Sequence, residues 1–285
     1  MQALIEKIRE AQSTAIGHFN ISDLSALKGI FEAALDLKLP VIIGLSDGER
    51  NFIGTKQAAA VVRSLRESYN FPIFINADHV KSLEGIKEAA EAGFDSVMLD
   101  AGDLSFKENM KKTKEAVELS KSINNNILVE GEIGYITGHS QIVNAEEWLI
   151  KEENLAKPEE AAEFVKETGV DLLAPAVGNI HGMFKGALMP NINIARIKEI
   201  KDAVGVPLVL HGGSGIENSD IISAIEAGIS IIHVNTELRL AWRNSLEKSL
   251  FENKEEIAPY KILPPVVNAI REVVENKLKL FNKSI

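Results

Sequence analysis

Three histidines, His79, His181 and His211, each come at the end of an apolar stretch of the kind that forms a buried strand. The carboxyl ends of parallel strands meet at one mouth of the sheet, where α/β proteins hold their catalytic residues. Three imidazole ligands with an open fourth position are typical of a catalytic zinc site. We therefore expect the three side chains to converge on one metal ion.

Acidic side chains end strands at the same mouth. Asp100 and Glu132 close the predicted fourth and fifth strands. They could bind the metal or a second ion, or orient the histidines by hydrogen bonds. Asp78 directly precedes His79, so the two point to opposite sides of a regular strand but both reach the mouth where the strand ends. Asp78 is then placed to move a proton at a substrate oxygen. The alternative for each acid is a solvated side chain or a helix cap.

A glycine cluster follows the predicted seventh strand, and a helix start follows the eighth. Gly212, Gly213 and Ser214 supply bare backbone N–H groups and a hydroxyl, and Asn235 and Thr236 open the helix. In barrels of parallel strands this is the usual place for a phosphate group. A tight glycine turn without a ligand is the alternative. Beside the histidines, the cluster favours a phosphorylated substrate.

The remaining histidines have weaker signals. His18 and His139 stand apart from the three described above, and a lone histidine is more often a surface or satisfied core residue. That interpretation is favoured for both. His233 lies in the predicted eighth strand, before Asn235.

Strand and helix patterns alternate along the whole chain. Repeats of about 30 residues are typical of βαβ units. Eight of them in sequence favour a closed (β/α)8 TIM barrel, formed by one domain of residues 1–285. Additional helices are expected at the N-terminus (1–10) and the C-terminus (264–285), and the polar stretch 135–153 reads as a long connection. No dinucleotide-binding glycine fingerprint follows the first strand. The expected strand regions are 15–20, 40–46, 73–79, 96–100, 127–134, 172–182, 207–215 and 229–235.

The composition limits the partners. The 285 residues carry a formal net charge of −10, which argues against a nucleic-acid partner. No cysteine is present, so any metal must be held by nitrogen and oxygen ligands. No apolar run reaches the length of a membrane span, and the charged, amphipathic start does not resemble a signal peptide. We expect a cytoplasmic protein that does not bind membranes.

Four motifs resemble the class II, metal-dependent fructose-bisphosphate aldolase family, which includes tagatose-bisphosphate aldolases. Residues 78–82 resemble the family's Asp-His-Gly-x-Ser, and residues 129–134 its Val-Glu-x-Glu-Leu-Gly. Residues 178–182 resemble Gly-x-x-His-Gly, and residues 210–215 contain His-Gly-Gly-Ser-Gly. The resemblance extends from near Phe19 almost to the C-terminus.

The resemblance implies a zinc-dependent aldolase, a lyase of glycolysis and carbohydrate metabolism that acts as a homo-oligomer on a sugar phosphate. It implies that Asp78 is the acid/base on the C4 hydroxyl and that Ser46 lies on the aldehyde side. Binding of a second divalent ion or of a monovalent cation is an open alternative. The implied metal ligands are His79, His181 and His211, with Asp100 and Glu132 at an alternative metal position. The implied contacts to dihydroxyacetone phosphate are Gly182, Gly212, Gly213, Ser214, His233, Val234, Asn235 and Thr236.

Five positions depart from the family pattern. His233 replaces an asparagine that contacts the dihydroxyacetone moiety, and Ile231 replaces a lysine. Val80 stands where the family has glycine. Ser140 and Gln141 occupy the places of an acidic pair in the loop after strand five. An imidazole still donates a hydrogen bond, and His139 beside the altered loop could move a proton.

Fructose 1,6-bisphosphate is the first substrate expected, with dihydroxyacetone phosphate and glyceraldehyde 3-phosphate as products. Tagatose 1,6-bisphosphate or another ketose phosphate is the alternative. A metal-dependent hydrolase with the same histidines is less favoured. A non-catalytic sugar-phosphate-binding protein is the alternative from another class, and the intact Asp78 and histidines argue against it.

Overall fold

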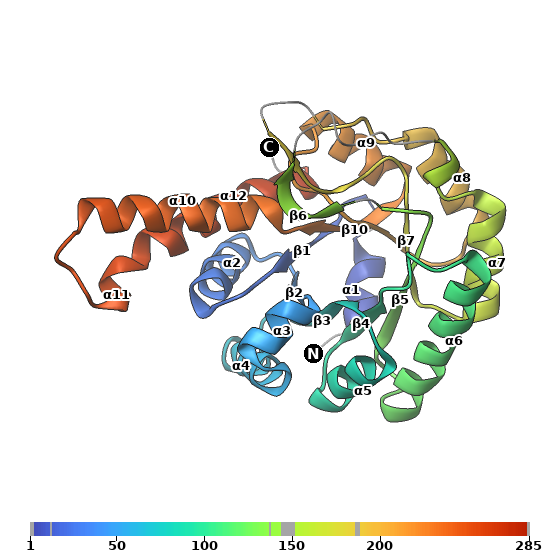
Figure 1. The fold of residues 1–285 in the computed structure, drawn as a ribbon, viewed down its shortest axis with the longest axis horizontal. Helices are drawn as coiled ribbons and strands as arrows, with labels where there is room; N and C mark the ends of the chain where they lie inside the picture. Colours follow the sequence, from blue (N-terminus) through green and yellow to red (C-terminus); the bar gives the residue numbers. More distant parts are fainter. Residues whose placement is uncertain (1–2, 12, 137, 144–151, 186–188, 284–285) are drawn as a thin grey trace.

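Eight parallel strands close into a barrel in the computed structural model, which describes residues 3–11, 13–136, 138–143, 152–185 and 189–283. The strand order around the barrel is β1-β10-β9-β7-β5-β4-β3-β2 (Figure 1). This confirms the predicted (β/α)8 architecture. The barrel strands are β1 (Ile16–Asn20), β2 (Val41–Leu45), β3 (Ile73–Val80), β4 (Ser96–Leu99), β5 (Leu128–Ile133), β7 (Leu172–Pro175), β9 (Leu208–Leu210) and β10 (Ile229–Val234).

Helices surround the barrel, because each strand leads into a helix that returns along the outside. Short polar side chains start several of them: Asp23, Ser82 and Ser105 each accept a hydrogen bond from a backbone N–H of the first helical turn. No described helix has the length and apolar character of a membrane span. The helices are α1 (Leu4–Glu10), α2 (Leu24–Leu37), α3 (Asp47–Ile53), α4 (Thr55–Tyr69), α5 (Leu83–Ala92), α6 (Phe106–Ile123), α7 (Pro158–Thr168), α8 (Ile194–Ala203), α9 (Asn218–Ala227), α10 (Thr236–Glu252), α11 (Pro259–Ile262) and α12 (Pro264–Phe281).

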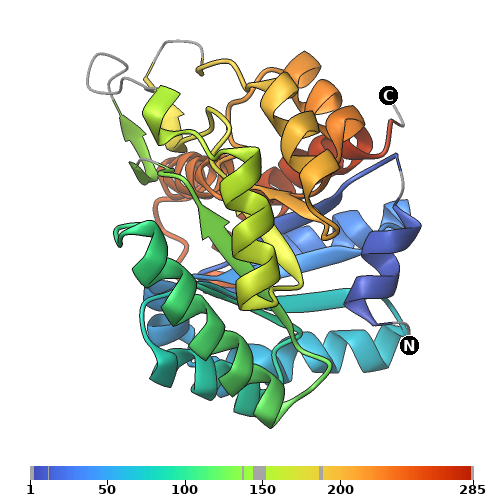
Figure 2. The same ribbon diagram turned by 90° about the vertical axis from the view of Figure 1, so that its right-hand side faces the viewer.

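The N-terminal helix α1 covers the amino-terminal end of the barrel. Its Leu4 and Ile8 form one buried apolar cluster with strand residues such as Ile16, Phe74 and Ile231. Figure 2 shows α1 at the end opposite to the loops that follow the strands. Because this end is filled by side chains, the open mouth lies at the carboxyl ends of the strands.

Two short strands outside the barrel correct the prediction for the connecting segments. β6 (Gly138–Val143) and β8 (His181–Phe184) pair in parallel to form a separate two-stranded sheet over the mouth. The predicted connection 135–153 therefore contains a strand. His181 does not end the sixth barrel strand, since β7 stops at Pro175 and His181 begins β8. Helix α3 was also not predicted, and β3 continues one residue beyond His79.

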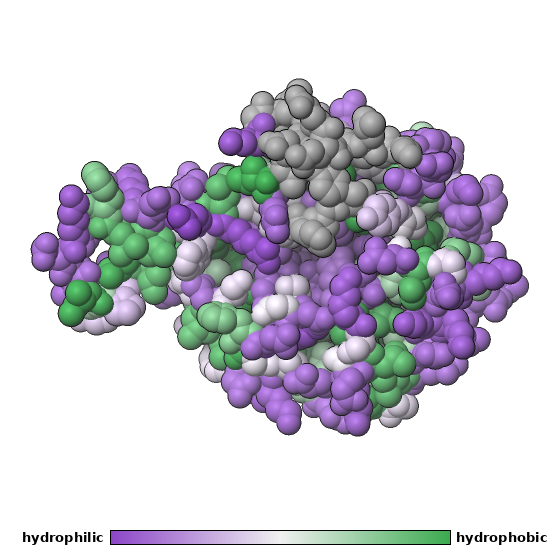
Figure 3. Space-filling view, in the orientation of Figure 1, coloured by the Kyte–Doolittle hydropathy of each residue, from purple (hydrophilic) through white to green (hydrophobic). Residues whose placement is uncertain are grey.

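The C-terminal helices form an arm that extends from the barrel. Helices α10, α11 and α12 project to one side in Figure 1, and the helix predicted at 264–285 is confirmed by α12. Apolar side chains cover part of the arm in Figure 3. The most exposed are Phe251 (73%), Ile257 (89%) and Tyr260 (77%). Exposed apolar side chains in this number are typical of a contact surface.

Candidate active site

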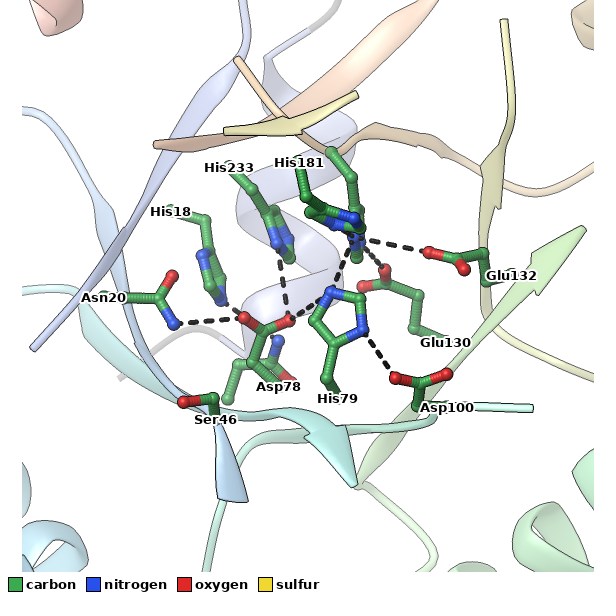
Figure 4. Close-up of polar contacts among 12 residues, drawn as sticks. His18, Asn20, Ser46, Asp78, His79, Asp100, Glu130, Glu132, His181 and His233 are labelled. Carbon is green, nitrogen blue, oxygen red and sulfur yellow. Dashed lines mark hydrogen bonds and ion pairs between the residues drawn. The ribbon is translucent and has the colours of Figure 1, made fainter. Parts of the chain in front are cut away.

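Three histidines and a glutamate meet at the barrel mouth (Figure 4). His79 Nε2 lies 3.2 Å from His211 Nδ1, and His181 Nε2 lies 3.4 Å from the same atom. Glu132 Oε2 lies 3.5 Å from His211 Nδ1. The ligand atoms of all four residues fall within 4.8 Å of one another. The predicted convergence of the three histidines is therefore present, although His181 arrives from β8 and not from a barrel strand.

The spacing of these atoms fits a small divalent ion. Metal–nitrogen bonds of about 2.0–2.1 Å in a tetrahedral site place ligand atoms about 3.3 Å apart. The observed separations of 3.2 Å and 3.4 Å agree with this value. Glu132 Oε2 is buried and has no hydrogen-bond partner among the described residues. Because buried polar atoms are normally paired, this oxygen is available to bind an ion.

Backbone strain at His79 brings it and Asp78 into the mouth together. His79 has φ +48°, a left-handed conformation that non-glycine residues rarely adopt. The pairing of β3 with β4 loses its register between Ala77 and Val80. In a regular strand, adjacent side chains would point to opposite faces. The irregular strand end permits both functional groups to face the cavity, as the sequence indicated.

Two carboxylates, the buried Glu130 and the partly buried Asp100, fix the tautomers of two histidines. Glu130 Oε1 accepts a hydrogen bond from His211 Nε2 at 2.7 Å, and both side chains are buried. Asp100 Oδ2 lies 3.2 Å from His79 Nδ1 and also pairs with Lys81. Each carboxylate thus takes the ring nitrogen that faces away from the cluster. The lone pairs of His79 Nε2 and His211 Nδ1 are left for an ion.

Charge within the cluster opposes the effect of burial on the histidines. Burial lowers the pKa of His79, but Asp78, Asp100 and Glu132 outweigh it and raise the pKa to about 10. Burial also lowers the pKa of His211, and Glu130 reverses the shift. Without a metal, the cluster therefore holds protons that a bound cation displaces.

Asp78 is held on one side only. Its Oδ2 accepts a hydrogen bond from Asn20 Nδ2 at 3.0 Å. Its Oδ1 is buried without a hydrogen-bond partner among the described residues, 3.6 Å from His233 Nδ1 and 3.9 Å from His79 Nε2. Burial raises the pKa of Asp78, but the adjacent histidines bring it well below the usual range. Asp78 thus presents an ionised oxygen to the cavity.

Glycine backbones and the start of α10 line another wall. Gly212 has φ +65°, and a Cβ atom there would lie 1.9 Å from the carbonyl oxygen of Ile180. The Ser214 hydroxyl accepts hydrogen bonds from the N–H groups of Asn235 and Glu237 at the start of α10. This close backbone approach beside a helix N-terminus is suited to a phosphate group.

The opposite wall comes from α3, β6 and α10. Ser46 donates hydrogen bonds to Glu49 Oε2 through its N–H at 2.8 Å and its hydroxyl at 2.9 Å. Arg239 donates to Glu49 Oε1 at 2.7 Å and to the Ser140 carbonyl at 3.2 Å. Glu49 is buried, so it fixes both groups at the edge of the cavity.

These walls enclose a cavity of about 430 Å³, which is large enough for a small phosphorylated sugar. Of the predicted site residues, Gly213 and Val234 do not line it. Gly213 instead donates a backbone hydrogen bond to the carbonyl of His233. The predicted residues that line the cavity are Ser46, Asp78, His79, Asp100, Glu132, His181, Gly182, His211, Gly212, Ser214, His233, Asn235 and Thr236.

The five residues that depart from the family pattern lie in different parts of the structure, and only some of them line the cavity. His233 and Ser140 line the cavity, whereas Gln141 is exposed outside it. Val80 is fully buried in the main core. Ile231 packs in the apolar cluster beneath α1. The side chain of His139 is outside the described part of the chain.

Sequence reasoning did not assign His18, Asn20 or Glu130 to the site. Asn20 binds Asp78, Glu130 binds His211, and the His18 ring stacks on that of His233. The signal for Asn20 was its position at the end of the first strand. Glu130 and Glu132 are two residues apart on β5, and side chains at this spacing lie on the same face of a strand, so both point into the barrel.

Known proteins resemble the chain over almost its whole length. The family described as "Fructose-bisphosphate aldolase class-II" matches residues 1–284. A fructose-bisphosphate aldolase of Geobacillus stearothermophilus is 38% identical over 95% of this chain and 92% of its own. The crystal structure of the YdjI aldolase from Escherichia coli K12 is 34% identical, covers 99% of this chain and 97% of its own, and has a TM-score of 0.83.

Proposed function

Because this chain belongs to the class II fructose-bisphosphate aldolase family, we propose that it reversibly cleaves fructose 1,6-bisphosphate. The products are dihydroxyacetone phosphate and glyceraldehyde 3-phosphate. The family is metal-dependent, and the histidine cluster offers a metal site. One observation carries the proposal: a three-histidine cluster lies directly beside the unpartnered oxygen of Asp78.

Zinc is the proposed metal, held by His79, His181 and His211. A bound zinc ion supplies Lewis-acid stabilisation of the negative charge that develops when the C3–C4 bond breaks. Glu132 is the adjacent carboxylate ligand for an alternative metal position. Asp100 accepts a hydrogen bond from Nδ1 of His79 and so orients the ring, which leaves Nε2 for the metal. A second divalent or monovalent cation would use the same acidic mouth.

Asp78 is the proposed acid/base. In the cleavage direction, its Oδ1 takes the proton of the C4 hydroxyl, and the C4–O bond becomes the aldehyde carbonyl. The electron pair of the C3–C4 bond passes to the dihydroxyacetone phosphate fragment, and the former C3 carbon then takes up one proton, which balances the proton lost from the C4 hydroxyl. Asn20 holds Oδ2, so the free oxygen faces the cavity. In the reverse direction, the same proton returns to the aldehyde oxygen.

The two ends of the substrate lie on the two walls. The phosphate of the dihydroxyacetone fragment is proposed to bind near Gly182, Gly212 to Ser214, and the residues from His233 to Thr236. The aldehyde fragment then lies beside Ser46 and Arg239, both lining the cavity. Arg239 supplies positive charge on that side, which suits a second phosphate.

We also propose one barrel domain over residues 1–285, a cytoplasmic location and a homo-oligomer of two or more chains. The apolar side chains exposed on the arm, among them Phe251 and Ile257, support self-association because it would remove them from water. Size-exclusion chromatography with light scattering tests this proposal. A monomer over the working concentration range would contradict it.

The direct test of the function is release of dihydroxyacetone phosphate from fructose 1,6-bisphosphate, measured by a coupled assay with and without a chelator. We expect release that the chelator abolishes and zinc restores. Release from tagatose 1,6-bisphosphate alone would identify that sugar as the substrate. No release from either sugar by the zinc-loaded protein would favour the binding-only alternative.

A further inference from the structure

Three imidazole rings stack in a column at the base of the cavity. His18 on β1 and His233 on β10 are direct partners in the parallel ladder. Their ring centroids are 3.5 Å apart, with 5° between the planes. The other face of His233 lies on His211, with centroids 4.1 Å apart and 23° between the planes. His233 is therefore confined on both faces, and Figure 4 shows it beside His18 and above Asp78.

The outer face of His18 rests on bare backbone. A Cβ atom at Gly44 would lie 2.0 Å from His18 Cε1, so a larger residue there would displace the ring. His18 is fully buried. With Gly44 on one face and His233 on the other, the ring cannot rotate out of its plane.

The edge of His18 is fixed as well. Asn76 Nδ2 lies 3.1 Å from His18 Nε2, and the other end of the same amide, Oδ1, accepts a hydrogen bond from Ser96 Oγ at 2.9 Å. Asn76 therefore donates to His18 Nε2. Burial lowers the pKa of His18 to about 4, so the ring is neutral and its proton is on Nδ1.

The remaining nitrogen of His18 makes no contribution that would explain its position. His18 Nδ1 is buried without a hydrogen-bond partner among the described residues. A buried donor without a hydrogen-bond partner destabilises the folded state. Nδ1 thus gives no reason for an imidazole at this position. Two features remain, namely the acceptor at Nε2 for Asn76 and the ring face against His233.

We infer that His18 is a positioning residue that acts through His233. Its stacked ring holds the His233 imidazole with Nδ1 directed at Asp78 Oδ1, 3.6 Å away. Asn20 binds the other carboxylate oxygen, and the His233 ring faces Oδ1 without a hydrogen bond, so the position of that ring determines the electrostatic surroundings of Oδ1. The inference rests on the proposed function, since Asp78 matters here as the group that exchanges a proton with the substrate.

Two substitutions separate the ring from the hydrogen bond. His18→Gln keeps an acceptor for Asn76 but removes the stacking face, and we expect kcat to fall about tenfold to a hundredfold. KM and bound zinc should stay unchanged. His18→Phe keeps both faces but loses the acceptor, and we expect kcat within about threefold of the parent, because the position of the His233 ring is retained. The control Phe74→Leu removes a ring from the far end of the barrel interior and should lower stability without changing kcat.

A double-mutant cycle shows whether His18 acts through His233. In a His233→Asn background, the further change His18→Gln should alter kcat less than about twofold, since the ring to be positioned is absent. The inference is overturned if His18→Gln has the parent kcat, if His18→Phe loses as much as His18→Gln, or if the loss is equal in both backgrounds.

A measurement that does not depend on catalysis distinguishes this inference from the proposed function. Nitrogen-15 NMR of histidine-labelled protein reports which ring nitrogen of His233 carries the proton. We expect Nδ1–H in the parent and in His18→Phe, and a mixture of tautomers in His18→Gln. An unchanged His233 spectrum in His18→Gln would refute the positioning role. A parent protein without aldolase activity would refute the proposed function alone.

Discussion

Glu130 should control metal affinity without touching the metal. Its carboxylate accepts a hydrogen bond from His211 Nε2 at 2.7 Å, and the two side chains are 2% and 1% exposed. In Glu130→Gln, the amide oxygen can still accept this bond but has no charge. Charge-assisted hydrogen bonds contribute about 1.5–3 kcal/mol and neutral ones about 1 kcal/mol. A loss of about 1.4 kcal/mol corresponds to about tenfold weaker zinc binding.

Competition with a chromogenic chelator measures this affinity. Glu160→Gln is the matched control, because it makes the same change on an exposed carboxylate of α7 that pairs with Lys157. We expect a zinc Kd about tenfold higher for Glu130→Gln and the parent Kd for Glu160→Gln. If Glu130→Gln binds zinc as tightly as the parent, the charge of Glu130 does not strengthen zinc binding through His211.

Three further outcomes follow from the site. Asp78→Asn should lower kcat at least about a hundredfold at unchanged zinc content, and parent activity in the coupled assay would eliminate Asp78 as the acid/base. Gly212→Ala should lower Tm in calorimetry, because its Cβ would lie 1.9 Å from the carbonyl oxygen of Ile180; an unchanged Tm would contradict this crowding. The pKa of His79 rises from 6.5 to about 10 in the folded, metal-free protein. Its stabilisation is therefore complete below pH 6.5 and is lost as the pH rises toward 10. The Tm of chelator-treated protein should fall across this window more than that of a His79→Gln variant, and equal slopes would count against the shift.

The barrel could be predicted from the sequence because local signals specify it. Buried parallel strands are continuous apolar runs, and short polar residues and prolines mark the helix starts. The sequence prediction lacks helix α3 although Ser46 and Glu49 form a capping box, because it assigns Ser46 to the end of a strand and to the substrate site and not to a helix start. β6 and β8 could not be predicted, since each is short and its partner lies far along the chain.

The same distinction separates the predicted and missed parts of the site. His79, His181 and His211 stand in recognisable local motifs, and their convergence follows from the barrel. His18 has no such motif. Its significance depends on β1 pairing with β10, which places it beside His233, and on the bare backbone of Gly44. A contact that exists only after closure of the barrel leaves no local pattern.

Closure of the barrel also has a consequence for synthesis on the ribosome. β1 is translated well before β10, yet it pairs with β10, and the Ala15 N–H donates to the carbonyl of Phe281 in α12 at 3.1 Å. A nascent chain cannot complete the sheet until β10 has left the exit tunnel, and it cannot make the contact to α12 until that helix has followed. Before then, β1 and β9 each present an unpaired edge that can associate with another chain. Nascent chains arrested before residue 229 should therefore depend on chaperones more than the finished protein does.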